Sequence, residues 1–167
     1  QTLAMEGLFA FFLESCFLGL FVFGERKLGP KLHFLAAVMM FAGSWLSGYL
    51  IVATNAWMQN PVAFEVESNG TVSLSSFWGL LLNPWIWWQW THTMIGAVVT
   101  ASFVVAAVGA FYLLARRNEE YGKEFVRIGV IAGVGASIRV AFPTGDGQWK
   151  NIAFCQPVTR AAMEGVF

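Results

Sequence analysis

The sequence contains little charge: Asp, Glu, Lys and Arg make up 12% of its 167 residues, against about a quarter of a typical soluble domain. Ten Lys and Arg balance ten Asp and Glu, so no surplus of positive charge is available to neutralise a phosphate backbone, and nucleic-acid binding is excluded. Its two cysteines, Cys16 and Cys155, are too few for a disulfide framework. Motifs for dithiol chemistry, zinc proteases, serine hydrolases and phosphate-binding loops are missing from the sequence.

Apolar residues are what the sequence has in quantity: they form 57% of it, with a mean hydropathy of +0.60. Four apolar segments are long enough to cross a bilayer as helices, which takes about 20 residues each: 3–24, 34–54, 85–114 and 125–142. They show no alternation of apolar and polar residues, so membrane-spanning strands are not expected. The sequence therefore predicts an all-α, polytopic membrane helix bundle with about four transmembrane helices over residues 1–143.

The basic residues of the connecting loops predict the orientation of the bundle. Residues 25–32 and 115–124 each contain three Lys or Arg, whereas residues 55–84 contain none. Basic short loops stay in the cytoplasm, so residues 55–84 and both chain ends are expected outside. The Trp residues at 85, 87, 88 and 90 are expected to form an aromatic belt at the outer interface. Residues 74–82 are too short to span and predict a short surface helix.

Two acidic residues, Glu6 and Glu14, lie inside the first apolar segment, where a carboxylate is costly unless it is protonated, paired or facing a wet or cofactor-filled cavity. Eight residues of helix rise about 12 Å and rotate by about 80°, so both side chains face one sector at two depths. This placement suits a proton relay or a pair of cofactor contacts, and Ser15 adds a hydroxyl beside Glu14. The alternative is that Glu6 lies at the outer interface and that Glu14 is a neutral, hydrogen-bonded acid.

His92 lies about 10 Å below the outer start of the third segment, in the sequence Trp-Thr-His-Thr-Met-Ile-Gly. An imidazole inside a membrane is either a haem or metal ligand or, more often, a hydrogen-bonded core residue. Gly96, one turn further on, leaves room for a flat macrocycle. His33 is expected at the cytoplasmic end of the second segment, too far in depth to share a haem with His92.

The tail, residues 144–167, is more polar than the rest of the chain. Its first residues favour a turn, and residues 156–167 predict a short amphipathic helix on the outer surface. There Glu164, beside Met163 and Phe167, offers a hydrogen-bond acceptor among apolar side chains, which would suit a quinol head group. On spacing alone, a solvated carboxylate on a surface helix is the better interpretation.

Three segments together resemble subunit I of the cytochrome bd quinol oxidases. They are Glu-Gly-Leu-Phe-Ala-Phe-Phe-Leu-Glu-Ser at 6–15, Ala-Thr-Asn-Ala-Trp-Met-Gln-Asn-Pro at 53–61, and Phe-Pro-Thr-Gly-Asp at 142–146 continuing to Ala-Ala-Met-Glu-Gly at 161–165. The resemblance covers nearly the whole chain in order. It implies a respiratory oxidase of a bacterial or archaeal plasma membrane that oxidises quinol at the outer face and reduces oxygen to water. The implied cofactors are a low-spin haem b, a high-spin haem b and haem d, and the implied partners are a second oxidase subunit and small accessory subunits.

The resemblance also implies roles for individual residues. Glu6 would ligate the iron of haem d or of the high-spin haem b, and Glu14 with Ser15 would line the proton path from the cytoplasm. His92 would be the axial ligand of the low-spin haem b. Glu164 would bind quinol in an outer loop that starts at residue 144.

The chain departs from the family's pattern mainly near the quinol site. Thr159 stands where many members carry a basic residue, although Arg160 is adjacent. Trp149, Cys155 and Arg139 are also unexpected. The family's other haem ligands, including the methionine partner of His92, would lie outside residues 1–167, so this piece alone is expected to be inactive. A proton-coupled transporter or channel without haem is the competing hypothesis for Glu6 and Glu14.

Overall fold

The computed structural model describes residues 2–166, which divide into two compact units, one ending at Trp90 and the other beginning at Thr91. The described chain is helical apart from one short β-hairpin, so the all-α class is confirmed. In chain order the elements are α1 (Thr2–Met5), η1 (Glu6–Ala10), α2 (Phe11–Gln59), β1 (Phe64–Val66), β2 (Val72–Leu74), α3 (Phe77–Leu81), α4 (Pro84–Leu114), α5 (Glu119–Arg139), η2 (Val140–Gly145), α6 (Asp146–Cys155) and α7 (Pro157–Glu164).

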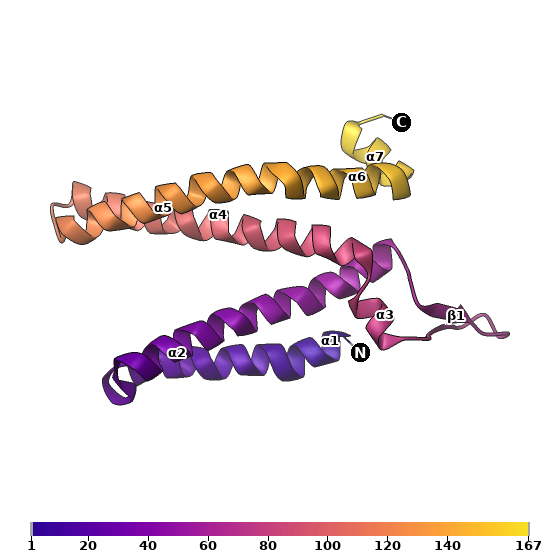
Figure 1. Cartoon of the computed structure of the whole chain (residues 1–167), viewed down its shortest axis with the longest axis horizontal. Helices are drawn as coiled ribbons and strands as arrows, with labels where there is room; N and C mark the ends of the chain where they lie inside the picture. The colour runs from indigo at the N-terminus through magenta and orange to yellow at the C-terminus, as the bar shows by residue number, and fades with distance from the viewer. Residues whose placement is uncertain (1, 167) are drawn as a thin grey trace. The chain divides into compact units, whose positions relative to one another are not determined.

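Helix α2 is a helical hairpin rather than one straight rod (Figure 1). The chain reverses at Gly29, whose φ of 68° and ψ of 165° are accessible only to glycine, and Pro30 follows it. Near this turn the Nε2 atom of His33 lies 2.8 Å from the carbonyl oxygen of Phe21, and the two rings stack. The two arms of the hairpin correspond to the first two predicted segments, and His33 serves to join them.

The loop after α2 contains a structure that the sequence did not predict. Strands β1 and β2 pair antiparallel, with Phe64 opposite Leu74, and Gly70 takes a positive φ of 82° in the turn. The short helix expected at residues 74–82 is present as α3. Its N-terminus is capped by Ser76, whose hydroxyl accepts a hydrogen bond from the backbone N–H of Gly79.

The start of α4 is buried within the first unit. The buried amide of Asn83 accepts from the backbone N–H of Trp85 at 3.0 Å and donates to the carbonyl of Asn60 at 2.9 Å. Trp85 and Ile86 pack into the unit's core with Ala53, Ala56 and Leu80. The expectation of an interfacial belt is therefore wrong for Trp85, which is 3% exposed because it fills the space between α2 and α3.

In the second unit α4 and α5 lie side by side along a seam of small residues (Figure 1). A Cβ atom on Gly109 would lie 2.8 Å from the carbonyl oxygen of Gly122, and one on Gly129 would lie 2.6 Å from that of Ser102. Backbones can approach this closely only where side chains are absent. Further along α5 the packing is looser: a Cβ atom on Gly133 would make an ordinary contact with Cβ of Ser102 at 3.4 Å, and one on Gly135 would face open space.

Three helices among residues 2–166 are long and apolar enough to cross a membrane: Leu3–Gln59, Pro84–Leu114 and Glu119–Cys155. The first contains two predicted segments, joined at Gly29. The third extends well beyond the predicted 125–142, because the chain stays helical on both sides of an extended Phe142 that precedes Pro143. Helix α6 was not foreseen, and the division of the chain at residue 143 stays a prediction. The amphipathic helix predicted after residue 156 is present as α7.

Candidate haem, proton and quinol sites

Both acidic residues of the first apolar segment are hydrogen-bonded to serines on the second arm of the α2 hairpin. The hydroxyl of Ser44 donates to Oε1 of Glu14 at 2.7 Å, and that of Ser47 donates to Oε1 of Glu6 at 3.0 Å. Both carboxyls are half-buried. The arms approach closely here, since a Cβ atom on Gly43 would lie 3.3 Å from the backbone of Glu14. The carboxyls thus face one neighbour at two depths, as their spacing predicted.

Glu6 is also the first residue of η1, a single wide helical turn. Such turns change the direction of a side chain relative to a regular helix and are common at functional sites. The sequence placed the hydroxyl of Ser15 beside Glu14, but Ser15 is exposed and the structure brings Ser44 to that carboxyl instead. Ser44 and Ser47 were missed. Two hydroxyls three residues apart in an apolar segment were the available signal, because such groups bond across membrane helices.

His92, on α4, is half-buried and touches η2. Its Nδ1 atom lies 3.4 Å from the hydroxyl of Thr144, a residue that is 6% exposed. A Cβ atom on Gly145 would lie 3.6 Å from Cε1 of the same ring. One edge of the imidazole is therefore held against η2. Nothing in the sequence indicates Thr144 as a partner of His92, because 52 residues separate the two.

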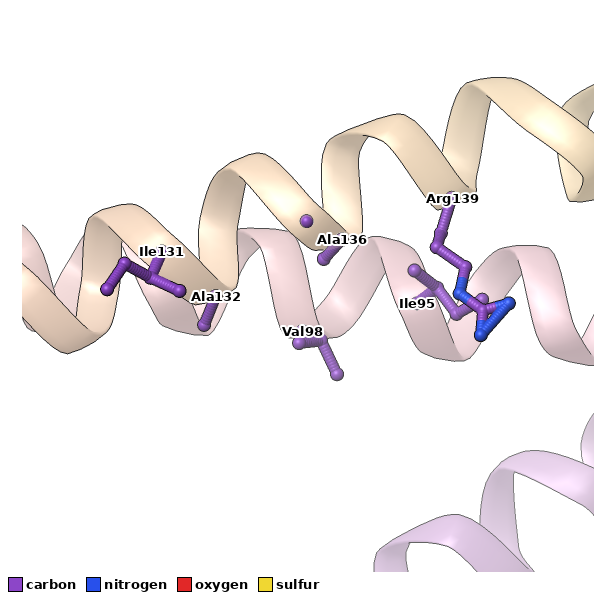
Figure 2. A pocket seen from close by; sticks show the side chains of 7 residues that line it. Ile95, Val98, Ile131, Ala132, Ala136 and Arg139 are labelled. Atoms are coloured by element: carbon purple, nitrogen blue, oxygen red, sulfur yellow. The ribbon is translucent and has the colours of Figure 1, made fainter.

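An open, apolar groove begins one turn along α4 from His92. Its volume is about 460 Å³, and its lining comes from α4 and α5: Ile95, Val98, Ile131, Ala132, Gly135, Ala136 and Arg139. Figure 2 shows the Arg139 side chain extending from α5 toward Ile95. Arg139, unexpected in an apolar segment, thus puts one positive charge at the end of an otherwise apolar wall.

These residues fit a haem group better than a bare metal ion. No group of three or more His, Cys, Asp or Glu that could hold a metal lies within residues 2–166. A haem iron takes four ligands from its macrocycle and needs only axial ligands from the protein. His92 could supply such a ligand, the groove offers an apolar wall, and Arg139 would complement the carboxylates that a haem carries.

Glu164, at the end of α7, is exposed and paired. Its Oε1 atom accepts from Nε of Arg160 at 3.2 Å, and the Arg160 guanidinium lies 5.8 Å from the centre of the Trp149 ring on α6. Trp149, one of the departures from the family pattern, therefore contacts Arg160, the basic residue next to Thr159, and Arg160 in turn contacts Glu164. Thr159 and Cys155 are exposed, and Phe167 lies outside the described residues.

Comparisons with known proteins identify the family. The family model of cytochrome bd terminal oxidase subunit I matches residues 1–167. The chain is 35% identical over 165 residues to cytochrome bd ubiquinol oxidase subunit 1 of Bacillus subtilis (strain 168), covering 99% of this chain and 35% of that protein. It is 38% identical over 165 residues to cytochrome bd-II ubiquinol oxidase subunit 1 of Escherichia coli (strain K12), covering 98% and 32%.

The fold agrees with these relatives. The bd oxidase from Geobacillus thermodenitrificans superposes with a TM-score of 0.86 at 28% identity, over 97% of this chain and 37% of that one. The chain therefore spans about a third of the length of the relatives it matches. Because the family model matches residues 1–167 of the chain, the chain belongs to the family of cytochrome bd terminal oxidase subunit I.

Proposed function

We propose that this chain forms the part of a respiratory terminal oxidase that binds the low-spin haem b, delivers protons to the oxygen-reducing site and contributes to quinol binding. The observation that carries the proposal is the position of His92. Its ring contacts Thr144, and an apolar groove that includes the Arg139 side chain begins one turn further along α4. Haems b and d, when bound, would supply the electron transfer and the reduction of oxygen. The reaction takes two electrons and two protons from each quinol and consumes four of each per oxygen molecule.

The chain's own residues would bind and move protons on the two sides of the membrane. Glu164 would accept a hydrogen bond from a quinol hydroxyl at the outer face, beside the guanidinium of Arg160. Glu14, in contact with Ser44 and next to Ser15, would hold a proton from the cytoplasm and pass it toward Glu6. Glu6, hydrogen-bonded to Ser47, would help to hold haem d or the high-spin haem b as a ligand of its iron.

The cellular setting follows from the same proposal. The protein would lie in a bacterial or archaeal plasma membrane, with its basic loops in the cytoplasm and residues 144–167 in the outer quinol loop. It would assemble with a second oxidase subunit and small accessory subunits. The Glu14–Ser44 and Glu6–Ser47 pairs alone would also serve a proton-coupled transporter. The apolar groove that begins one turn along α4 from His92 favours the oxidase.

A reduced-minus-oxidised visible spectrum of the full-length oxidase tests the proposal. We expect His92→Ala to abolish the band of the low-spin haem b, because the iron loses an axial ligand. His33→Ala is the matched control: that imidazole bonds to the carbonyl of Phe21, and its removal should leave the haem spectrum intact. An unchanged spectrum in His92→Ala would overturn the assignment of His92. Absence of haem from the folded, full-length protein would favour the transporter.

A further inference from the structure

We propose that Thr144 is a positioning residue for the haem: it fixes the tautomer and orientation of His92 so that Nε2 presents its lone pair to the iron. The inference rests on the proposed function, in which His92 is an axial ligand. The role is not visible from the sequence, because Thr144 lies in η2, 52 residues from His92.

The first step is to account for the single proton of the Thr144 hydroxyl. That hydroxyl donates to the backbone carbonyl of Arg139 at 2.8 Å, and the carbonyl of Val140, at 3.3 Å, lies within reach of the same proton. With its proton committed to these carbonyls, the oxygen can offer only a lone pair to His92. The Nδ1 atom, 3.4 Å away, must therefore carry the hydrogen of a neutral imidazole, and the lone pair lies on Nε2.

The second step is that η2 fixes the ring in place as well as its tautomer. Thr144 is 6% exposed, so water does not compete for its hydroxyl. Gly145 covers the Cε1 side of the ring, and a Cβ atom there would lie 2.6 Å from the carbonyl oxygen of Val140. Within residues 91–166 as described, the ring makes its one hydrogen bond through Nδ1, which leaves the Nε2 edge for a ligand.

A hydrogen bond from Nδ1–H to an acceptor makes an imidazole a more basic ligand and fixes its orientation. A more basic axial ligand stabilises ferric over ferrous iron. Thr144 should therefore hold the midpoint potential of the low-spin haem b below the value it would have with an unbonded imidazole. Loss of the hydroxyl should raise that potential and loosen the haem.

The test compares Thr144→Val with Thr144→Ser in the full-length oxidase by spectroelectrochemical titration. Val keeps the shape of the side chain and removes the acceptor, whereas Ser keeps the hydroxyl. For Val we expect the ferrous-to-ferric ratio at the wild-type midpoint to rise on the order of tenfold, about 59 mV for one electron, with weaker haem retention. For Ser we expect the wild-type potential and haem content.

A wild-type potential in Thr144→Val, with His92→Ala lacking the low-spin haem, would overturn the role of Thr144 and leave the proposed function standing. A normal haem spectrum in His92→Ala would instead overturn the proposed function. If Thr144→Val fails to assemble, the midpoint potentials of Thr144→Ala and Thr144→Ser are compared instead. Equal potentials in those two smaller variants would overturn the inference, and a higher potential in Thr144→Ala alone would support it.

Discussion

At the residue scale, the contact between Glu14 and Ser44 defines how a proton could be held inside the α2 hairpin. The serine proton points at Oε1 of the carboxyl, so the second oxygen is the one that can take up and release a proton. The bond, at 2.7 Å, has the usual length for a hydroxyl donor, and it lies in a half-buried setting where a hydrogen bond is stronger than in water.

Replacing Glu14 with Gln separates the hydrogen bond from the proton. The amide oxygen can still accept from Ser44, so the hairpin should keep its packing, but the amide cannot carry a proton. We expect turnover at saturating quinol to fall by about 100-fold, the lower end of what a positioned acid or base contributes, with the quinol KM unchanged. Oxygen uptake measured beside the haem spectrum checks this.

The matched control for this change is Glu65→Gln, the same substitution on the exposed strand β1. It should leave turnover at the wild-type rate. Wild-type turnover in Glu14→Gln would show that protons reach the oxygen site by another route. A lost haem spectrum in Glu14→Gln would show that this carboxyl holds the structure together rather than carrying protons.

The exposed ion pair of Arg160 and Glu164 acts on its immediate surroundings rather than on the stability of the fold. Exposed ion pairs of this kind contribute little to stability, roughly 0–1 kcal/mol, so the pair does not hold α7 in place. Its effect is local: Arg160 bridges Trp149 and Glu164, and it keeps a positive charge beside the carboxyl. Under the proposed function, Arg160 would substitute for the basic residue that many family members carry at the position of Thr159.

At the element scale, the close packing of α4 and α5 predicts opposite effects on stability for alanine substitutions at two glycines of α5. A methyl group on Gly129 would meet the backbone of Ser102 at 2.6 Å and of Ala106 at 2.7 Å, and neither can give way. We expect Gly129→Ala to destabilise the protein by about 1–3 kcal/mol, the usual cost of overpacking. Thermal melting of the purified oxidase in detergent measures it.

Gly133→Ala, one turn further along α5, is the control. Its methyl group would lie 3.4 Å from Cβ of Ser102, an ordinary contact. Alanine is also a better helix former than glycine by about 1 kcal/mol, so this variant should melt at or above the wild-type temperature. A Gly129→Ala protein as stable as wild type would mean that the two helices are not packed this closely.

The elements that composition and local turn chemistry determine could be predicted from the sequence. The apolar segments, the reversal near Gly29 and Pro30, and the short helices α3 and α7 all depend on neighbouring residues. The features that were missed depend on distant ones. Ser44 meets Glu14 across 30 residues, Thr144 meets His92 across 52, and Trp85 is buried because α2 and α3 pack around it. Hydropathy and spacing carry no information about which helices pair.

At the scale of the whole molecule, the long helices leave much apolar surface uncovered. Phe23 is 81% exposed, Leu114 86% and Ile131 66%. In water such surface would be unfavourable at about 25 cal/mol per Å². Within a bilayer it is compatible with lipid and with further helices, and the relatives have about three times this length.

The two free cysteines report on the orientation of the whole molecule. Cys155 ends α6, in the tail expected on the outer side, whereas Cys16 lies in the first apolar segment, where hydrocarbon keeps out a water-soluble reagent. A membrane-impermeant maleimide applied to intact spheroplasts should label the full-length chain at Cys155. The label assigned to this site should be lost in Cys155→Ser and unchanged in Cys16→Ser. Labelling of Cys155 only in inverted vesicles would reverse the orientation, place the basic loops outside, and remove Glu164 from the face at which quinol is proposed to bind.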